Sequence, residues 1–117
     1  MKVNVIKIEK PWGWEKWLEV NDQYVVKELF MMSGNSCSLQ YHEKKHESFY
    51  VIKGQLSFEV GEDNHNLVTL ILNAGDYYTI KPKIVHRMTA LTDSLYIESS
   101  TNFLDDVIRL EDKYGRV

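Results

Sequence analysis

The feature of this sequence that most limits its fold is the alternation of apolar and polar side chains over short stretches. Leu56, Phe58 and Val60 alternate with polar or charged neighbours, which is the period of two expected of a half-buried strand. Similar β-rich runs lie at 14–20, 24–32, 38–42, 48–53, 67–72, 77–81, 85–90 and 95–99, and turn-forming residues separate them. So many short strands predict an all-β sandwich, jelly roll or small barrel rather than an α/β fold.

One segment near the C-terminal end has a helical signature instead. Asn102 is a suitable N-cap for a helix over 103–110, and Asp105 and Asp106 would lie near its positive end. We therefore expect a short C-terminal helix. The chain has 117 residues and no visible linker or repeat, so we expect residues 1–117 to form one domain.

Charge and cysteine content limit the classes of partner. The net charge is −3 and the 14 Lys and Arg are scattered, so we expect no nucleic-acid partner. No apolar run is long enough to span a membrane, so no membrane partner is expected either. Cys37 is the single cysteine, which excludes an internal disulfide and is typical of the cytoplasm. We interpret Cys37 as a small strand residue rather than a nucleophile, since its serine neighbours offer no activation.

Four side chains in the middle of the sequence have the chemistry of metal ligands. Gln40 and His42 are two positions apart, so they share one face of a strand. Glu47 begins the next β-rich run, and His86 lies at the start of a later one. If these strands face one interior, the set suits Zn²⁺, Fe²⁺ or Mn²⁺. The alternative is that the histidines are hydrogen-bonded core or surface residues and that Gln40 satisfies a backbone group.

The spacing of these residues resembles that of the cupin superfamily. The first cupin motif is matched by Gly34, Gln40-Tyr41-His42, Glu47 and Gly54, with Gln40 in place of the usual first histidine. The second motif is similar to Gly75, Pro82 and His86, although Ala90 stands where an asparagine is often found. The resemblance implies a cupin double-stranded β-helix, which is a jelly-roll barrel.

A narrower resemblance covers residues 10–116. Lys10-Pro11-Trp12-Gly13, the run at 38–42 and the run at 109–116 are similar, in order and spacing, to the C-terminal cupin domain of type II phosphomannose isomerases. It implies a homodimer in polysaccharide biosynthesis that interconverts mannose 6-phosphate and fructose 6-phosphate. It also implies one divalent metal ion, bound by Gln40, His42, Glu47 and His86. Zinc is the first candidate for this ion, and Fe, Mn, Co and Ni are the alternatives. No Gly-rich nucleotide loop occurs in these residues, so we expect no guanylyltransferase activity from them.

An isomerase of this kind needs a base near the reacting carbon. Lys45 shares the inward parity of Glu47 and is the predicted catalytic base, provided that burial beside a metal lowers its pKa. Lys44 and His46 are competitors for this role, and Lys44 is also a candidate for substrate binding. Lys44 stands where the family commonly has a second histidine. The alternative is that all three residues lie in a charged, solvated loop.

The isomerase also needs to bind the phosphate of its substrate. Arg109 and Arg116 are the candidates, because a guanidinium group matches phosphate oxygens bidentately, and Arg116 is a catalytic candidate as well. Alternatively, these arginines pair with Asp106 or Asp112 and fasten the C-terminal segment.

The outward parity of Tyr50 and Ile52 predicts an exposed apolar patch that suits a homodimer.

Two other functions stay open on the same fold. One is a non-catalytic cupin that binds a sugar or sugar nucleotide. The other is an Fe(II) oxygenase, since His42, Glu47 and His86 form a two-histidine-one-carboxylate set. Gln40 argues against the oxygenase because it would occupy a fourth coordination position.

Overall fold

The computed structural model describes residues 5–117, so residues 1–4 of the expected domain lie outside the described part. Within residues 5–117 there is no helix, and therefore none that could cross a membrane. All regular structure is β, in the strands β1 (Ile6–Lys10), β2 (Gly13–Val20), β3 (Tyr24–Met31), β4 (Leu39–Tyr41), β5 (Glu47–Lys53), β6 (Gln55–Gly61), β7 (Val68–Asn73), β8 (Tyr77–Ile80), β9 (Val85–Ala90), β10 (Ser94–Thr101) and β11 (Ile108–Glu111). The nine runs expected from the sequence match strands to within two residues at each end.

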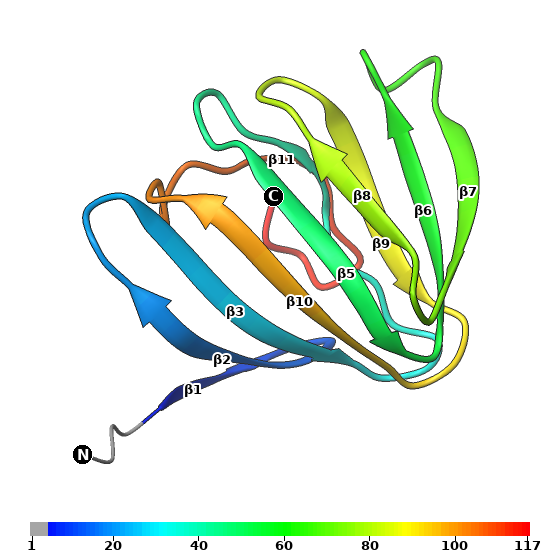
Figure 1. Cartoon of the computed structure of the whole chain (residues 1–117). Coiled ribbons are helices and arrows are strands. Elements are labelled where there is room, and N and C mark those ends of the chain that lie inside the picture. Colours follow the sequence, from blue (N-terminus) through cyan, green and yellow to red (C-terminus); the bar gives the residue numbers. More distant parts are fainter. Residues whose placement is uncertain (1–4) are drawn as a thin grey trace.

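The strands form two antiparallel sheets that face each other (Figure 1). One sheet has six strands in the order β1-β2-β3-β10-β5-β8, and the other has five in the order β11-β4-β9-β6-β7. Strands that are neighbours in space are often distant in sequence, as with β3 and β10 or β4 and β9. This is the expected jelly-roll arrangement, and it brings the inward side chains of both sheets together.

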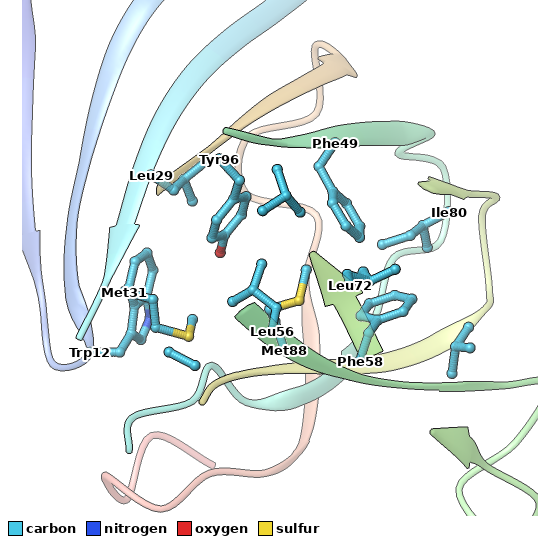
Figure 2. Packing of buried hydrophobic residues seen from close by; sticks show 13 residues of the cluster. Trp12, Leu29, Met31, Phe49, Leu56, Phe58, Leu72, Ile80, Met88 and Tyr96 are labelled. Carbon is cyan, nitrogen blue, oxygen red and sulfur yellow. The ribbon is translucent and has the colours of Figure 1, made fainter. Parts of the chain in front are cut away.

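The core lies between the sheets and follows the predicted alternation. Leu56 and Phe58 are fully buried on β6, and the Phe58 ring packs at 5.3 Å from Phe49 across the two sheets. Figure 2 shows this cluster, with Trp12 and Met31 at one end of it. Each large apolar side chain buried in this way stabilises the fold by about 1.5–3 kcal/mol.

The two ends of the strands differ in chemistry, and this difference positions the site. Along β5 the buried residues are Glu47, Phe49 and Val51 in turn, and along β9 His86 is followed by Met88. Each strand thus passes from a polar end to an apolar end. The polar side chains therefore rest on a rigid apolar base, which restricts their movement.

The predicted C-terminal helix is wrong. Residues 103–106 form a turn, closed by the Asp106 N–H donating to the Phe103 carbonyl at 3.1 Å, and Ile108 then begins β11. The Asp106 carboxylate accepts backbone N–H bonds from Glu43, Lys44 and Lys45 at 2.7–3.0 Å. Because Asp106 is bound to that loop and β11 pairs with β4, long-range contacts override the local helical signal.

The Lys10-Pro11-Trp12-Gly13 motif forms the hairpin turn between β1 and β2, a pairing that the sequence did not reveal. Trp12 is buried at the end of the core. Gly13 packs so closely that a Cβ there would overlap the carbonyl oxygen of Phe30. The motif is therefore architectural: it makes the turn between β1 and β2 and anchors this hairpin to the core through Trp12.

Candidate metal centre

Three of the four predicted ligands meet at one point between the sheets. His42 follows β4, Glu47 is the first residue of β5, and His86 is the second residue of β9. One ligand atom from each residue lies within 4.8 Å of the others, and all three residues are buried. Glu47 Oε1 is 3.5 Å from His42 Nε2 and 3.4 Å from His86 Nε2.

The backbone determines which nitrogen of each histidine faces this point. His42 Nδ1 contacts the carbonyl of Asp106, and His86 Nδ1 contacts the carbonyl of Ile84 at 3.0 Å. A carbonyl only accepts, so each Nδ1 carries a hydrogen, and in the neutral ring the Nε2 lone pair points at Glu47. Two lone pairs and a carboxylate oxygen that converge in this way repel one another, and a cation between them would remove that repulsion. Two nitrogen donors and one oxygen donor fit a divalent transition metal.

Gln40 shares this location. It lies directly opposite His86 in the β4–β9 pair, and its side chain lines the same cavity. Its Nε2 donates to the Ser38 carbonyl at 3.4 Å. The four predicted ligands are thus in one cavity, three of them at a common point.

Glu47 and Lys45 form a buried ion pair. Lys45 Nζ is 3.0 Å from Glu47 Oε2, the oxygen that faces away from the histidines. Burial would raise the pKa of Glu47, but its contacts with the His42 and His86 imidazoles and the charge of Lys45 outweigh burial and hold this pKa well below its usual range. The Glu47 carboxylate is therefore ionised, as a metal ligand must be.

Lys45 does not have the lowered pKa that its predicted role as a base requires. Burial alone would lower the pKa of the Lys45 ammonium, but Glu98 and Glu47 outweigh burial and raise it. Lys45 Nζ is 3.2 Å from Glu98 Oε1 as well as close to Glu47. In its protonated form, Lys45 would orient the Glu47 carboxylate through their 3.0 Å contact.

The site opens into a cavity of about 260 Å³ between the sheets, and both predicted arginines line it. Arg116 donates from Nε and from Nη2 to the carboxylate of Asp112 at 2.8 and 2.9 Å, which is one of the two ion bridges weighed from the sequence. Over residues 5–117, no carboxylate lies within ion-pair distance of Arg109. The two arginines therefore differ in how much of their charge is compensated.

The other candidates lie outside the cavity. Lys44 and His46 are exposed, and neither is among the cavity-lining residues. The backbone N–H of Lys44 donates to Asp106, and that of His46 donates to Thr101. The charged, solvated loop weighed as an alternative describes these two residues, whereas Lys45 is buried.

Sequence reasoning missed three charged residues that line the cavity: Glu15, Lys27 and Glu98. Glu15 and Lys27 form a buried ion pair at 3.4 Å, and Glu98 reaches Lys45 from β10. Each occupies an inward position of its strand, where alternation predicts an apolar residue. A charged residue at such a position was the signal that could have identified them.

Comparisons with known proteins agree with this geometry. The family profile described as Cupin domain matches residues 28–97. The chain is 29% identical over 115 residues to the xanthan biosynthesis protein XanB of Xanthomonas campestris, covering 94% of this chain and 24% of that protein. It is 26% identical over 116 residues to the mannose-1-phosphate guanylyltransferase of Escherichia coli, covering 95% of this chain and 23% of that protein. The chain thus spans about a quarter of the length of these relatives and corresponds to their C-terminal cupin region.

Solved structures share the fold at lower identity. The capsular polysaccharide assembling protein CapF of Staphylococcus aureus superposes with a TM-score of 0.80 at 16% identity, over 95% of this chain and 33% of that chain. KdgF of Halomonas sp. gives a TM-score of 0.71 at 19% identity, over 85% and 87% of the two chains. At such identities the likeness bears on the fold alone, and it confirms the jelly roll.

Proposed function

Because this chain belongs to the cupin family, we propose that it is a metal-dependent isomerase that interconverts mannose 6-phosphate and fructose 6-phosphate. The observation that carries this proposal is the meeting of His42, Glu47 and His86 in a cavity that two arginines also line. Relatives named for xanthan biosynthesis and for mannose 1-phosphate chemistry support a sugar phosphate as the substrate. We treat residues 1–117 as one cupin domain of a cytoplasmic protein in polysaccharide biosynthesis.

A bound divalent ion would supply Lewis-acid polarisation of the sugar oxygens that gain negative charge during isomerisation. His42, Glu47 and His86 would hold it, with Gln40 as the fourth ligand, and zinc is the first candidate because it suits this donor set. The backbone carbonyls behind the two imidazoles fix their orientation, and Lys45 fixes that of Glu47. The chain thus provides a site whose ligands need little rearrangement.

We place the substrate phosphate against Arg109, with Arg116 beside it. Both arginines line the metal cavity, and a guanidinium group binds phosphate bidentately. Arg109 has no ion-pair partner over residues 5–117, so its charge is available to an anion. Lys44 lies outside the cavity and is not needed in this arrangement.

One observation favours a second candidate, a cupin that binds a sugar phosphate without turning it over. Arg116 is engaged by Asp112, and Lys45 is held protonated by two carboxylates, so neither residue has the state expected of a catalytic group. The Fe(II) oxygenase is less well supported, because Gln40 lines the cavity beside the three ligands.

NMR spectroscopy of mannose 6-phosphate incubated with the purified chain separates these candidates. We expect fructose 6-phosphate to form with metal-loaded protein, to stop forming after chelation, and to return when metal is added back. A His42→Ala, His86→Ala double variant, which loses two predicted ligands, is the negative control. Sugar-phosphate binding without any product would refute the isomerase and favour the binding protein.

We also propose that the chain forms a homodimer through the outer face of the six-stranded sheet. Tyr50, Ile52 and Tyr77 are 49%, 42% and 65% exposed on this face, and Tyr50 lies opposite Tyr77 in the β5–β8 pair. A group of exposed apolar side chains of this kind is typical of a protein–protein interface.

A further inference from the structure

Glu98 is a partly buried carboxylate to which the proposed function assigns no role. Its strand, β10, lies between β3 and β5, and its side chain lines the metal cavity. The Lys45 ammonium links it to the metal centre, through contacts of 3.2 Å to Glu98 Oε1 and 3.0 Å to Glu47 Oε2. Lys45 therefore bridges one carboxylate that belongs to the predicted ligand set and one that does not.

Four other titratable groups of the cavity are less suited to accept a proton. Lys45 Nζ lies between the carboxylates of Glu47 and Glu98, which both favour its ammonium form. Burial raises the pKa of the Cys37 thiol to about 11, so it is also protonated at neutral pH. The carboxylate of Asp106 is occupied by three backbone N–H groups. Glu15 accepts from the Trp17 indole at 2.9 Å and pairs with Lys27.

Resting on the isomerase function proposed above, we propose that Glu98 is the catalytic base that removes the C2 proton of mannose 6-phosphate, with Lys45 as the residue that positions it. The Glu98 carboxylate takes the proton from C2 of the open-chain aldose, and the electron pair of that C–H bond forms the C1–C2 double bond of an enediol. The carbonyl oxygen at C1 gains the charge and takes up the proton that the C2 hydroxyl gives up. Return of the proton from Glu98 to C1 then leaves a carbonyl at C2, which is the ketose, so no oxidant or further reactant is needed.

The surroundings of Glu98 suit this role. Burial and the negative charge of Glu47 raise the pKa of Glu98, while the charges of Lys45 and Lys27 oppose the increase. A base works best when its pKa lies closer to the working pH than that of an exposed carboxylate does. The side chain is 14% exposed, so it has access to the cavity and little contact with bulk water.

The test compares Glu98→Gln with a matched variant, Glu15→Gln. Both glutamates are charged, inward-facing residues of the same cavity, but Glu15 is paired with Lys27 instead of Lys45. In heavy water, metal-loaded wild-type protein should incorporate deuterium at C2 of mannose 6-phosphate. We expect this exchange to fall at least about 100-fold in Glu98→Gln, the typical effect of losing a general base, and to stay within about threefold in Glu15→Gln.

Two further measurements separate a catalytic role from a structural one. Metal content and calorimetric affinity for mannose 6-phosphate should stay within about twofold of wild type in Glu98→Gln, because Glu98 is not a predicted ligand. Glu98→Asp keeps a carboxylate at a shorter reach and should retain more exchange than Glu98→Gln.

Deuterium exchange within about fivefold of wild type in Glu98→Gln would overturn the role of Glu98. A loss of exchange no larger than the loss of bound metal or of sugar affinity in that variant would also overturn it. Product formation by the wild type without C2 exchange would also overturn it, while leaving the isomerase intact. A metal-loaded wild type that forms no product would overturn the proposed function itself, so the two failures are distinguishable.

Discussion

Arg109 and Arg116 line the same cavity, yet the structure predicts different results when each is replaced by alanine. Over residues 5–117 Arg109 has no carboxylate within ion-pair distance, whereas Arg116 forms a two-bond ion pair with Asp112. Removing Arg109 should therefore mainly reduce the binding of a phosphate. Removing Arg116 should mainly release the C-terminal segment, whose Tyr114 packs against the core and whose Lys113 donates to the Gly34 carbonyl.

The expected magnitudes follow from these contacts. Arg109→Ala should lose a charge-assisted contact of about 1.5–3 kcal/mol, which is about a 10- to 150-fold increase in Kd for mannose 6-phosphate. Arg116→Ala should lose about 1–2 kcal/mol of folding free energy, because the Arg116 side chain is 25% exposed and solvent screens part of the pair. Its Kd should change less than about fivefold, because Asp112 already compensates the Arg116 charge.

Isothermal titration calorimetry of metal-loaded protein gives the two affinities, and urea unfolding gives the two stabilities. Arg109→Lys is a useful control, since it keeps the charge but loses the bidentate geometry, and it should fall between wild type and Arg109→Ala. The reasoning would be refuted if Arg109→Ala bound mannose 6-phosphate as tightly as wild type, or if Arg116→Ala lost affinity while keeping its full stability.

Two further predictions concern acid stability and assembly. The Arg116 guanidinium lowers the pKa of the Asp112 carboxyl from 3.8 to about 2, so this pair stabilises the fold above about pH 4 and stops doing so as the pH falls toward 2. The difference in unfolding free energy between wild type and Asp112→Asn should therefore shrink between pH 4 and pH 2, and a constant difference in urea titrations would argue against the ion pair. For assembly, light scattering should give a mass of twice 13.8 kDa for wild type and a lower mass for Tyr50→Lys. Ile71→Lys, at a residue 50% exposed on the other sheet, should leave the dimer intact, and an unchanged mass for Tyr50→Lys would exclude this face as the interface.

Much of the fold could be predicted because strand alternation is a local signal. The inward positions of Phe49 and Val51 and the outward positions of Tyr50 and Ile52 follow from parity alone, and the structure has them as expected. The same parity predicts that Glu47 and Lys45 face inward, and both are buried. The meeting of His42, Glu47 and His86 also needs the pairing of distant strands, for which the cupin-like spacing was the only guide.

What sequence could not supply depends on long-range contacts. The capping residues after Thr101 indicate a helix, but Asp106 binds the 43–45 loop and Ile108 pairs with Tyr41 on β4. The pKa of Lys45 depends on two carboxylates, and Glu98, one of the two, comes from a strand 53 positions away. Burial alone lowers that pKa, whereas the two ion pairs raise it, and their presence could not be seen in the sequence.

Metal analysis tests the central claim most directly, namely that His42, Glu47 and His86 hold a divalent ion. After loading with zinc and removal of free metal, mass spectrometry should find close to one zinc per wild-type chain and less than about a tenth of that in a His42→Ala, His86→Ala double variant. His46→Ala, which removes an exposed histidine of the adjoining loop, should retain the wild-type content. One zinc per chain in the double variant, or none in the loaded wild type, would contradict the account.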